Sequence, residues 1–80
     1  MNVKTLTAKR FEQLCRERGI SINRLASLSG VTPSTAYSML DKNRRDISLV
    51  TVKKFCDGLD ITLGELFSTD EFNSLEQEIK

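Results

Sequence analysis

The sequence has no histidine and no tryptophan, and among its 80 residues it has only two cysteines and one proline. Without His or a Cys-x-x-Cys pair, it lacks the usual ligand sets of zinc sites. Cys15 and Cys56 lie far apart within apolar helical patterns, which is typical of buried thiols rather than of a disulfide framework. A glycine-rich phosphate loop, paired carboxylates at a cleft and an activated nucleophile are also missing. We therefore expect no metal, no cofactor and no enzymatic activity.

Long apolar runs are missing too. No stretch approaches the roughly 20 apolar residues that cross a bilayer, and the N-terminal MNVKTLTAKR does not resemble a secretion signal. The pattern predicts a cytoplasmic protein without membrane contacts. A chain of 80 residues with 39% hydrophobic content suits one domain with a small core. It leaves little room for a deep catalytic cleft, and no small-molecule ligand is evident, so we expect a surface function.

The chain also lacks a strong excess of one charge, because its net charge is +1. The charge is unevenly placed, however. Residues 1–68 carry a net +4, whereas residues 69–80 carry Asp70, Glu71, Glu76 and Glu78 against Lys80. This asymmetry predicts a basic domain over 1–68 and an acidic, amphipathic tail over 69–80.

Apolar residues recur at spacings of three and four, without sustained alternation, which predicts an all-α fold. The first helix is expected from Thr5 or Thr7 to Arg18, with Gly19 ending it. Ser21 caps a second helix that stops at Ser29 and Gly30. Thr32 and Pro33 open a third helix that continues through Leu40.

After a polar loop over 41–46, Ser48 caps a fourth helix, which ends within residues 57–60. Its apolar stripe consists of Leu49, Val52, Phe55, Cys56 and Leu59. Thr62 and Glu65 form the capping box of a short fifth helix. In the tail, Phe72, Leu75 and Ile79 share one stripe, which indicates a short C-terminal amphipathic helix.

The segment from Ser21 to Leu40 is the most informative for function. It consists of a short helix, a turn containing Gly30 and a second helix with a sharp start. Two short helices that cross steeply project the second one outward, where it fits the major groove of DNA.

The runs INRLASLSGVTPSTAYSML and ISLVTVKKFCDGLDITLGELF resemble the phage-repressor and Cro-type helix-turn-helix family, also called the XRE family, over roughly residues 8–67. The resemblance is carried by Leu25-Ala26, Gly30-Val31, Ser34-Thr35, Leu59, Ile61 and Leu66-Phe67. It implies a compact repressor-like DNA-binding domain of four or five helices. It also implies double-stranded DNA as the partner and a homodimer as the binding form.

The third helix is expected to turn Ala36, Met39 and Leu40 toward the core. The base-contacting positions of the family fall on its outward side, on Thr32, Pro33, Ser34, Tyr37 and Ser38. The alternative is that Tyr37 only covers the edge of the core and that the serines are solvent-exposed surface residues without a function. Because residues 32–40 contain no Arg, Lys, Gln or Asn, base discrimination is expected to be modest or to depend on DNA shape.

Phosphate contacts are expected at the start of the second helix and in the loop after the third. The candidates are Ser21, Asn23, Lys42, Asn43, Arg44 and Arg45, with Arg24 as an addition. Outside this context, such a basic run would be interpreted as a solvated loop.

The sequence departs from the family at three positions. Ile22 stands where many relatives carry a phosphate-bridging Gln. Cys15 and Leu40 stand where many relatives bury an Arg against a Glu. Both partners of that pair are apolar here, so no lone charge is stranded.

The sequence leaves two functions open. The first is a sequence-specific DNA-binding transcriptional regulator, expected to be a repressor. The second is a helix-turn-helix scaffold used as a protein-interaction module or antitoxin-like partner. Basic residues flanking the third helix favour the regulator.

Overall fold

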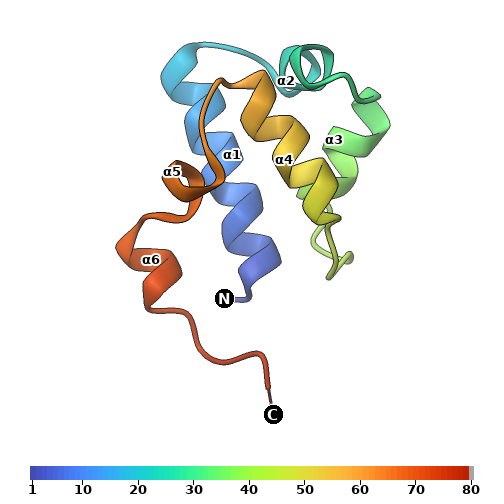
Figure 1. Cartoon of the computed structure of the whole chain (residues 1–80). Helices are drawn as coiled ribbons and strands as arrows, with labels where there is room; N and C mark the ends of the chain where they lie inside the picture. Colours follow the sequence, from blue (N-terminus) through green and yellow to red (C-terminus); the bar gives the residue numbers. More distant parts are fainter. Residues whose placement is uncertain (80) are drawn as a thin grey trace.

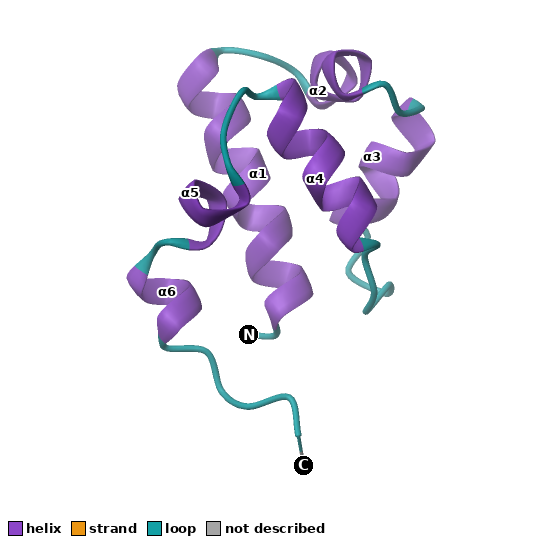
Figure 2. Cartoon of the chain, in the orientation of Figure 1, coloured by secondary structure: helices purple, strands orange, loops and turns teal. Residues whose placement is uncertain are grey.

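The computed structural model describes residues 1–79, which form six helices and no strand (Figures 1 and 2). The helices are α1 (Val3–Arg18), α2 (Ile22–Ser29), α3 (Pro33–Leu40), α4 (Leu49–Gly58), α5 (Leu63–Phe67) and α6 (Asp70–Asn73). The all-helical fold is therefore confirmed. In Figure 1, α3 lies to one side of α1 and α4, while α5 and α6 lie to the other.

The core lies where α1, α2 and α4 meet. Phe11 of α1 and Phe55 of α4 are both fully buried, and their ring centroids lie 5.3 Å apart. The other fully buried apolar residues are Leu25, Ala26, Ala36, Cys56, Leu59 and Leu66. They come from α2, α3, the end of α4 and α5, so burial of apolar surface ties every helix except α6 into one cluster.

Four helix starts agree with the predicted caps. The side-chain oxygens of Ser21, Thr32, Ser48 and Thr62 each accept a backbone amide of the following first turn. At α5 the capping box is complete, because the Thr62 amide also donates to Glu65 Oε1 at 2.9 Å. Caps of this kind satisfy amides that have no partner inside the helix.

The predicted start of α1 at Thr5 or Thr7 is wrong. The helix begins at Val3, because Asn2 is its N-cap and accepts the Thr5 amide at 2.8 Å. The extra turn brings Lys4 onto the buried side of the helix. Leu49 is also misplaced by the sequence pattern: as the first residue of α4 it lies at the edge of the packed region and is 69% exposed.

The C-terminal helix is shorter than its apolar stripe suggested. Phe72 of α6 packs edge-to-face on Phe67, with ring centroids 5.0 Å apart. The helix ends at Asn73, Leu75 is half-buried beyond it, and Ile79 is 87% exposed. Asn73 and Ser74 favour caps and turns, and so short a helix is marginal without packing along its length. The prediction that Phe72, Leu75 and Ile79 share one stripe of a C-terminal helix is therefore wrong. Residue 80 lies outside the described residues.

No helix in residues 1–79 is both long and apolar enough to cross a membrane.

Candidate nucleic-acid interface

The α2-turn-α3 unit is built by two sharp helix boundaries. Gly30 ends α2 with φ +68°, in the left-handed region that favours glycine. The Val31 amide then donates to the Ala26 carbonyl oxygen at 3.1 Å, which closes the turn. Two residues later Thr32 caps α3, and Pro33 occupies its first turn without leaving an amide unpaired. The turn is therefore short, and its backbone hydrogen bonds and caps hold α3 at a set angle to α2.

One face of α3 is buried and the other is open. Ala36 and Met39 are buried and Leu40 is partly buried against the core, as expected. The side chains of Thr32, Pro33, Ser34 and Tyr37 are exposed, and Tyr37 is 52% exposed. The exposed face carries hydroxyl groups and a phenol but no charge, so it can approach a DNA groove without first losing the hydration of a charge.

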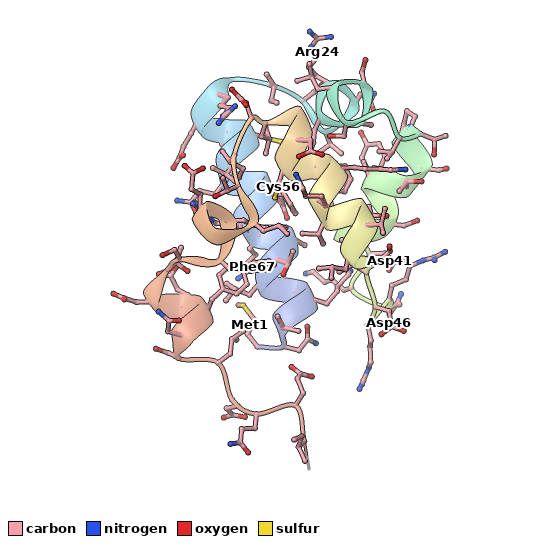
Figure 3. All side chains as sticks on the ribbon, viewed as in Figure 1. Met1, Arg24, Asp41, Asp46, Cys56 and Phe67 are labelled. Carbon is pink, nitrogen blue, oxygen red and sulfur yellow. The ribbon has the colours of Figure 1, made fainter. Side chains whose placement is uncertain are left out.

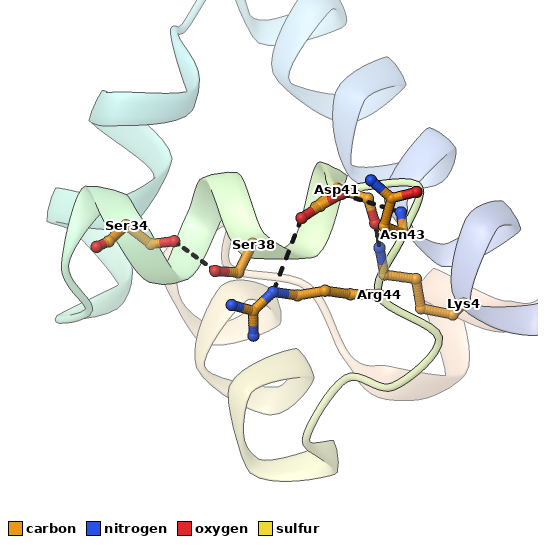
Figure 4. Close-up of polar contacts among 6 residues, drawn as sticks. All are labelled: Lys4, Ser34, Ser38, Asp41, Asn43 and Arg44. Atoms are coloured by element: carbon orange, nitrogen blue, oxygen red, sulfur yellow. Dashed lines mark hydrogen bonds and ion pairs between the residues drawn. The ribbon is translucent and has the colours of Figure 1, made fainter.

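Ser38 is less free than its neighbours. It is half-buried, and its hydroxyl donates to the Ser34 carbonyl oxygen at 2.9 Å (Figure 4). While that bond is kept, Ser38 can only accept a hydrogen bond from another molecule. As a base contact, Ser38 is therefore limited to bases that present a hydrogen-bond donor.

Two of the proposed contact residues also serve as helix caps. Ser21 Oγ accepts the Arg24 amide at 3.0 Å, and Thr32 Oγ1 accepts the Thr35 amide at 3.3 Å. The Thr32 and Thr35 hydroxyl oxygens also lie 3.1 Å apart, within hydrogen-bond distance. Asn23 is exposed beside the Ser21 cap, whereas Ile22 is partly buried against the core. Ile22 thus anchors the start of α2 by packing.

The basic loop after α3 is ordered by Asp41. Lys42, Asn43, Arg44 and Arg45 are all exposed. The Asp41 carboxylate accepts the Asn43 amide at 2.9 Å and lies 3.8 Å from Arg44 Nε (Figure 4). Lys42, Asn43 and Arg44 therefore share one tight turn, which the Arg44 amide closes on the Asp41 carbonyl oxygen, and Arg45 follows it. Arg24 extends from α2, away from the loop region marked by Asp41 and Asp46 in Figure 3.

Sequence reasoning missed Lys4 and the role of Asp41. Lys4 is only 4% exposed, and its ammonium donates to the Asp41 carbonyl oxygen at 2.6 Å. A signal was present: Lys4 precedes Ala8, Phe11 and Cys15 at helical spacing, so it lies on the buried stripe of α1. A lysine on such a stripe must find a polar partner.

A small hollow of about 120 Å³ lies between α3, the loop and the start of α4. Thr35, Ser38 and Arg44 supply polar groups to its wall, and Ser48 and Thr51 line the side of α4. The loop therefore does not pack flat on α3.

The two cysteines, Cys15 and Cys56, are buried free thiols. Burial raises the pKa of each thiol above its usual value. Within residues 1–79, no group of three or more Cys, Asp or Glu side chains is placed to hold a metal ion. Cys15 is buried, and Leu40 is partly buried against the core.

Comparison with known proteins gives three findings. The family model of the Cro/C1-type helix-turn-helix DNA-binding domain matches residues 10–71. Over 37 residues, 46% of the chain, the sequence is 49% identical to the control protein C.MunI from Mycoplasma sp, and this match covers 50% of that relative's length. The crystal structure of the prophage Lp1 protein 11 superimposes with a TM-score of 0.82 at 23% identity, over 92% of this chain and 97% of that one. This last likeness shows a shared fold.

Proposed function

The chain belongs to the Cro/C1-type helix-turn-helix DNA-binding family, and we propose that it is a sequence-specific transcriptional regulator with α3 as its recognition helix. The single observation that carries this proposal is that α3 has one buried face, with Ala36 and Met39, and one exposed face, with Tyr37. A helix whose buried face packs on the core and whose opposite face is exposed can enter the major groove. The family is one of DNA-binding domains and not an enzyme class.

The base-reading residues are Thr32, Pro33, Ser34, Tyr37 and Ser38. Tyr37 packs on a thymine methyl group, and the serine hydroxyls contact base edges. Their exposure supports this assignment for all but Ser38, which accepts rather than donates. With no bidentate side chain on this face, DNA shape supplies part of the specificity.

The phosphate-binding residues are Ser21 and Asn23 at the start of α2 and Lys42, Asn43, Arg44 and Arg45 after α3. Three full positive charges in this loop suit a phosphate backbone, and the N-terminal ends of the helices add partial positive charge. Residues 1–68 form the DNA-binding domain and residues 69–80 the acidic tail.

The protein represses by occupying two half-sites as a homodimer, in the compartment that holds the DNA, without an enzymatic step or a small-molecule ligand. Half-sites of such dimers lie about 34–36 Å apart. The name of the relative C.MunI, a control protein, supports a regulatory role. The dimer doubles the number of bases read, which compensates for the lack of bidentate side chains on the exposed face of α3.

Selection of bound duplexes from a random pool tests this function. The expected result is an enriched motif of two related half-sites with centres about 10 base pairs apart. Recovery of no enriched motif would contradict the proposal and favour the alternative, an interaction module that uses the same scaffold. Repeating the selection with Ser38→Ala should change base preference at one position of each half-site.

A further inference from the structure

Lys4 is the one buried charged residue among residues 1–79. Its side chain runs from the first turn of α1 to the end of α3, which lies 37 residues away in sequence. Lysine is rarely buried unless its ammonium has a partner. Among the described residues, that partner is not a carboxylate, because the ion pairs present there join Arg44 to Asp41 and Lys53 to Asp57.

The partner is the backbone carbonyl oxygen of Asp41, the C-cap residue of α3. A cation at this end of a helix is favoured by the partial negative charge of the last carbonyl groups. The same oxygen accepts the Arg44 amide at 3.1 Å. One carbonyl thus receives both the buried ammonium, whose bond Figure 4 shows, and the amide that closes the basic loop.

We propose that Lys4 is a positioning residue for DNA binding, which fixes the end of α3 and the turn that carries Asn43 and Arg44. This inference rests on the proposed function, because it assigns these loop residues to phosphate contacts. Lys4 holds the Asp41 carbonyl from the interior, while the Asp41 carboxylate holds the Asn43 amide and the Arg44 side chain from outside.

The ammonium of Lys4 does not itself contact DNA. At 4% exposure it cannot reach a phosphate without leaving the carbonyl oxygen to which it donates. Its contribution is preorganisation: a loop already ordered in the free protein loses less conformational freedom on binding. Removing Lys4 therefore weakens DNA binding through Arg44 and its neighbours.

The test replaces Lys4 by Met, which keeps an apolar stem of similar length but cannot donate. Lys9→Met is the matched control, because it removes one charge from an exposed position of the same helix. Affinity for the selected duplex is measured where each variant is fully folded. We expect Lys4→Met to weaken binding roughly 3- to 10-fold and Lys9→Met to change it much less.

A double-mutant cycle separates positioning from a general effect on folding. If Lys4 acts through the loop, Lys4→Met costs little further affinity in an Arg44→Ala background. Fully additive effects would overturn the inference while leaving the proposed function intact. Equal losses for Lys4→Met and Lys9→Met would overturn it as well. Failure of the wild-type protein to bind any duplex would overturn both.

A measurement on the wild-type protein guards against a Lys4→Met variant that does not fold. The Arg44 amide, which donates to Asp41, should exchange with solvent more slowly than the amides of Lys42 and Arg45. In mild acetylation, Lys4 should react more slowly than Lys9. Exchange of the Arg44 amide at the rate of an unstructured peptide would overturn the inference.

Discussion

Gly58 of α4 lies directly against Ser29 of α2. A Cβ atom at position 58 would sit 3.0 Å from the Ser29 backbone nitrogen and the Leu28 carbonyl carbon, and it would clash with Ser29 Oγ. Because backbone atoms cannot rotate away, the two helices approach this closely only with glycine at position 58. The contact fixes the position of α2 relative to α4. Because α3 is joined to α2 by a short turn, it also influences the position of α3.

Gly58→Ala should lower the free energy of unfolding by about 1–3 kcal/mol, the usual cost of overpacking. Gly64→Ala is the control, because the nearest atom to a Cβ at that site, Thr62 Oγ1, lies 3.8 Å away. Alanine there should be neutral or raise stability by up to about 1 kcal/mol, since it favours helix. Urea denaturation followed by circular dichroism measures both. Equal effects of the two substitutions would contradict this account of the α2–α4 contact.

Ser29→Ala should leave stability unchanged or raise it by about 1 kcal/mol, because Ser29 Oγ is buried with no hydrogen-bond partner among the described residues. It should also recover part of the loss caused by Gly58→Ala, since it removes the nearest clashing atom. The same denaturation experiments on the double variant measure this coupling. A clear loss of stability in Ser29→Ala alone would show that the hydroxyl is satisfied.

The capping box of α5 should make stability depend on acid pH. Hydrogen bonds from the backbone and side chain of Thr62 hold the pKa of Glu65 below its usual value. A carboxylate with a lowered pKa stabilises the fold above its unfolded-state pKa of about 4.3, and that contribution is lost as pH falls through the lower folded-state value. Melting temperatures of wild type and Glu65→Gln should therefore differ at neutral pH and converge in acid. A difference that does not change with pH would contradict this role.

The buried thiols should be unreactive in the folded protein. Burial raises the pKa of Cys15 and Cys56, so the nucleophilic thiolate is scarce at pH 8. A thiol reagent should modify both residues quickly only in denaturant. Folding stability should also fall as pH rises above about 8.5, where unfolded cysteines ionise first. Fast modification of either thiol in the native protein would show that its site is open.

Most helix starts were predictable because they depend on neighbours in sequence. Thr32 beside Pro33, and Thr62 three residues before Glu65, are local patterns with local causes. The α6 stripe failed because a helix needs packing along its length, and Ile79 finds none. Lys4 was missed because its partner, Asp41, lies across the fold. The exposed face of α3 was predictable from helical periodicity, whereas the bond from Ser38 to Ser34 was not.

Arg44→Ala/Arg45→Ala should weaken binding to specific and unrelated duplexes alike. Each lost phosphate contact should reduce the slope of log affinity against log salt by about 0.9, so the pair should reduce it by about 1–2. The control is Lys53→Ala/Lys54→Ala, which removes two exposed charges from α4. Fluorescence anisotropy over a range of salt concentrations measures both slopes. A larger change for the α4 pair than for the loop pair would contradict the assigned phosphate contacts.

Tyr37 allows a direct test of whether the open face of α3 meets the bases, because it is the only tyrosine in the chain. Protein made with 3-fluorotyrosine carries one fluorine reporter, at a side chain that is 52% exposed. Fluorine NMR during titration with the selected duplex should show this resonance shift and broaden, with a smaller change for an unrelated duplex. If the selected duplex binds, as verified by anisotropy, while the Tyr37 resonance stays unchanged, the exposed face of α3 does not contact the bases.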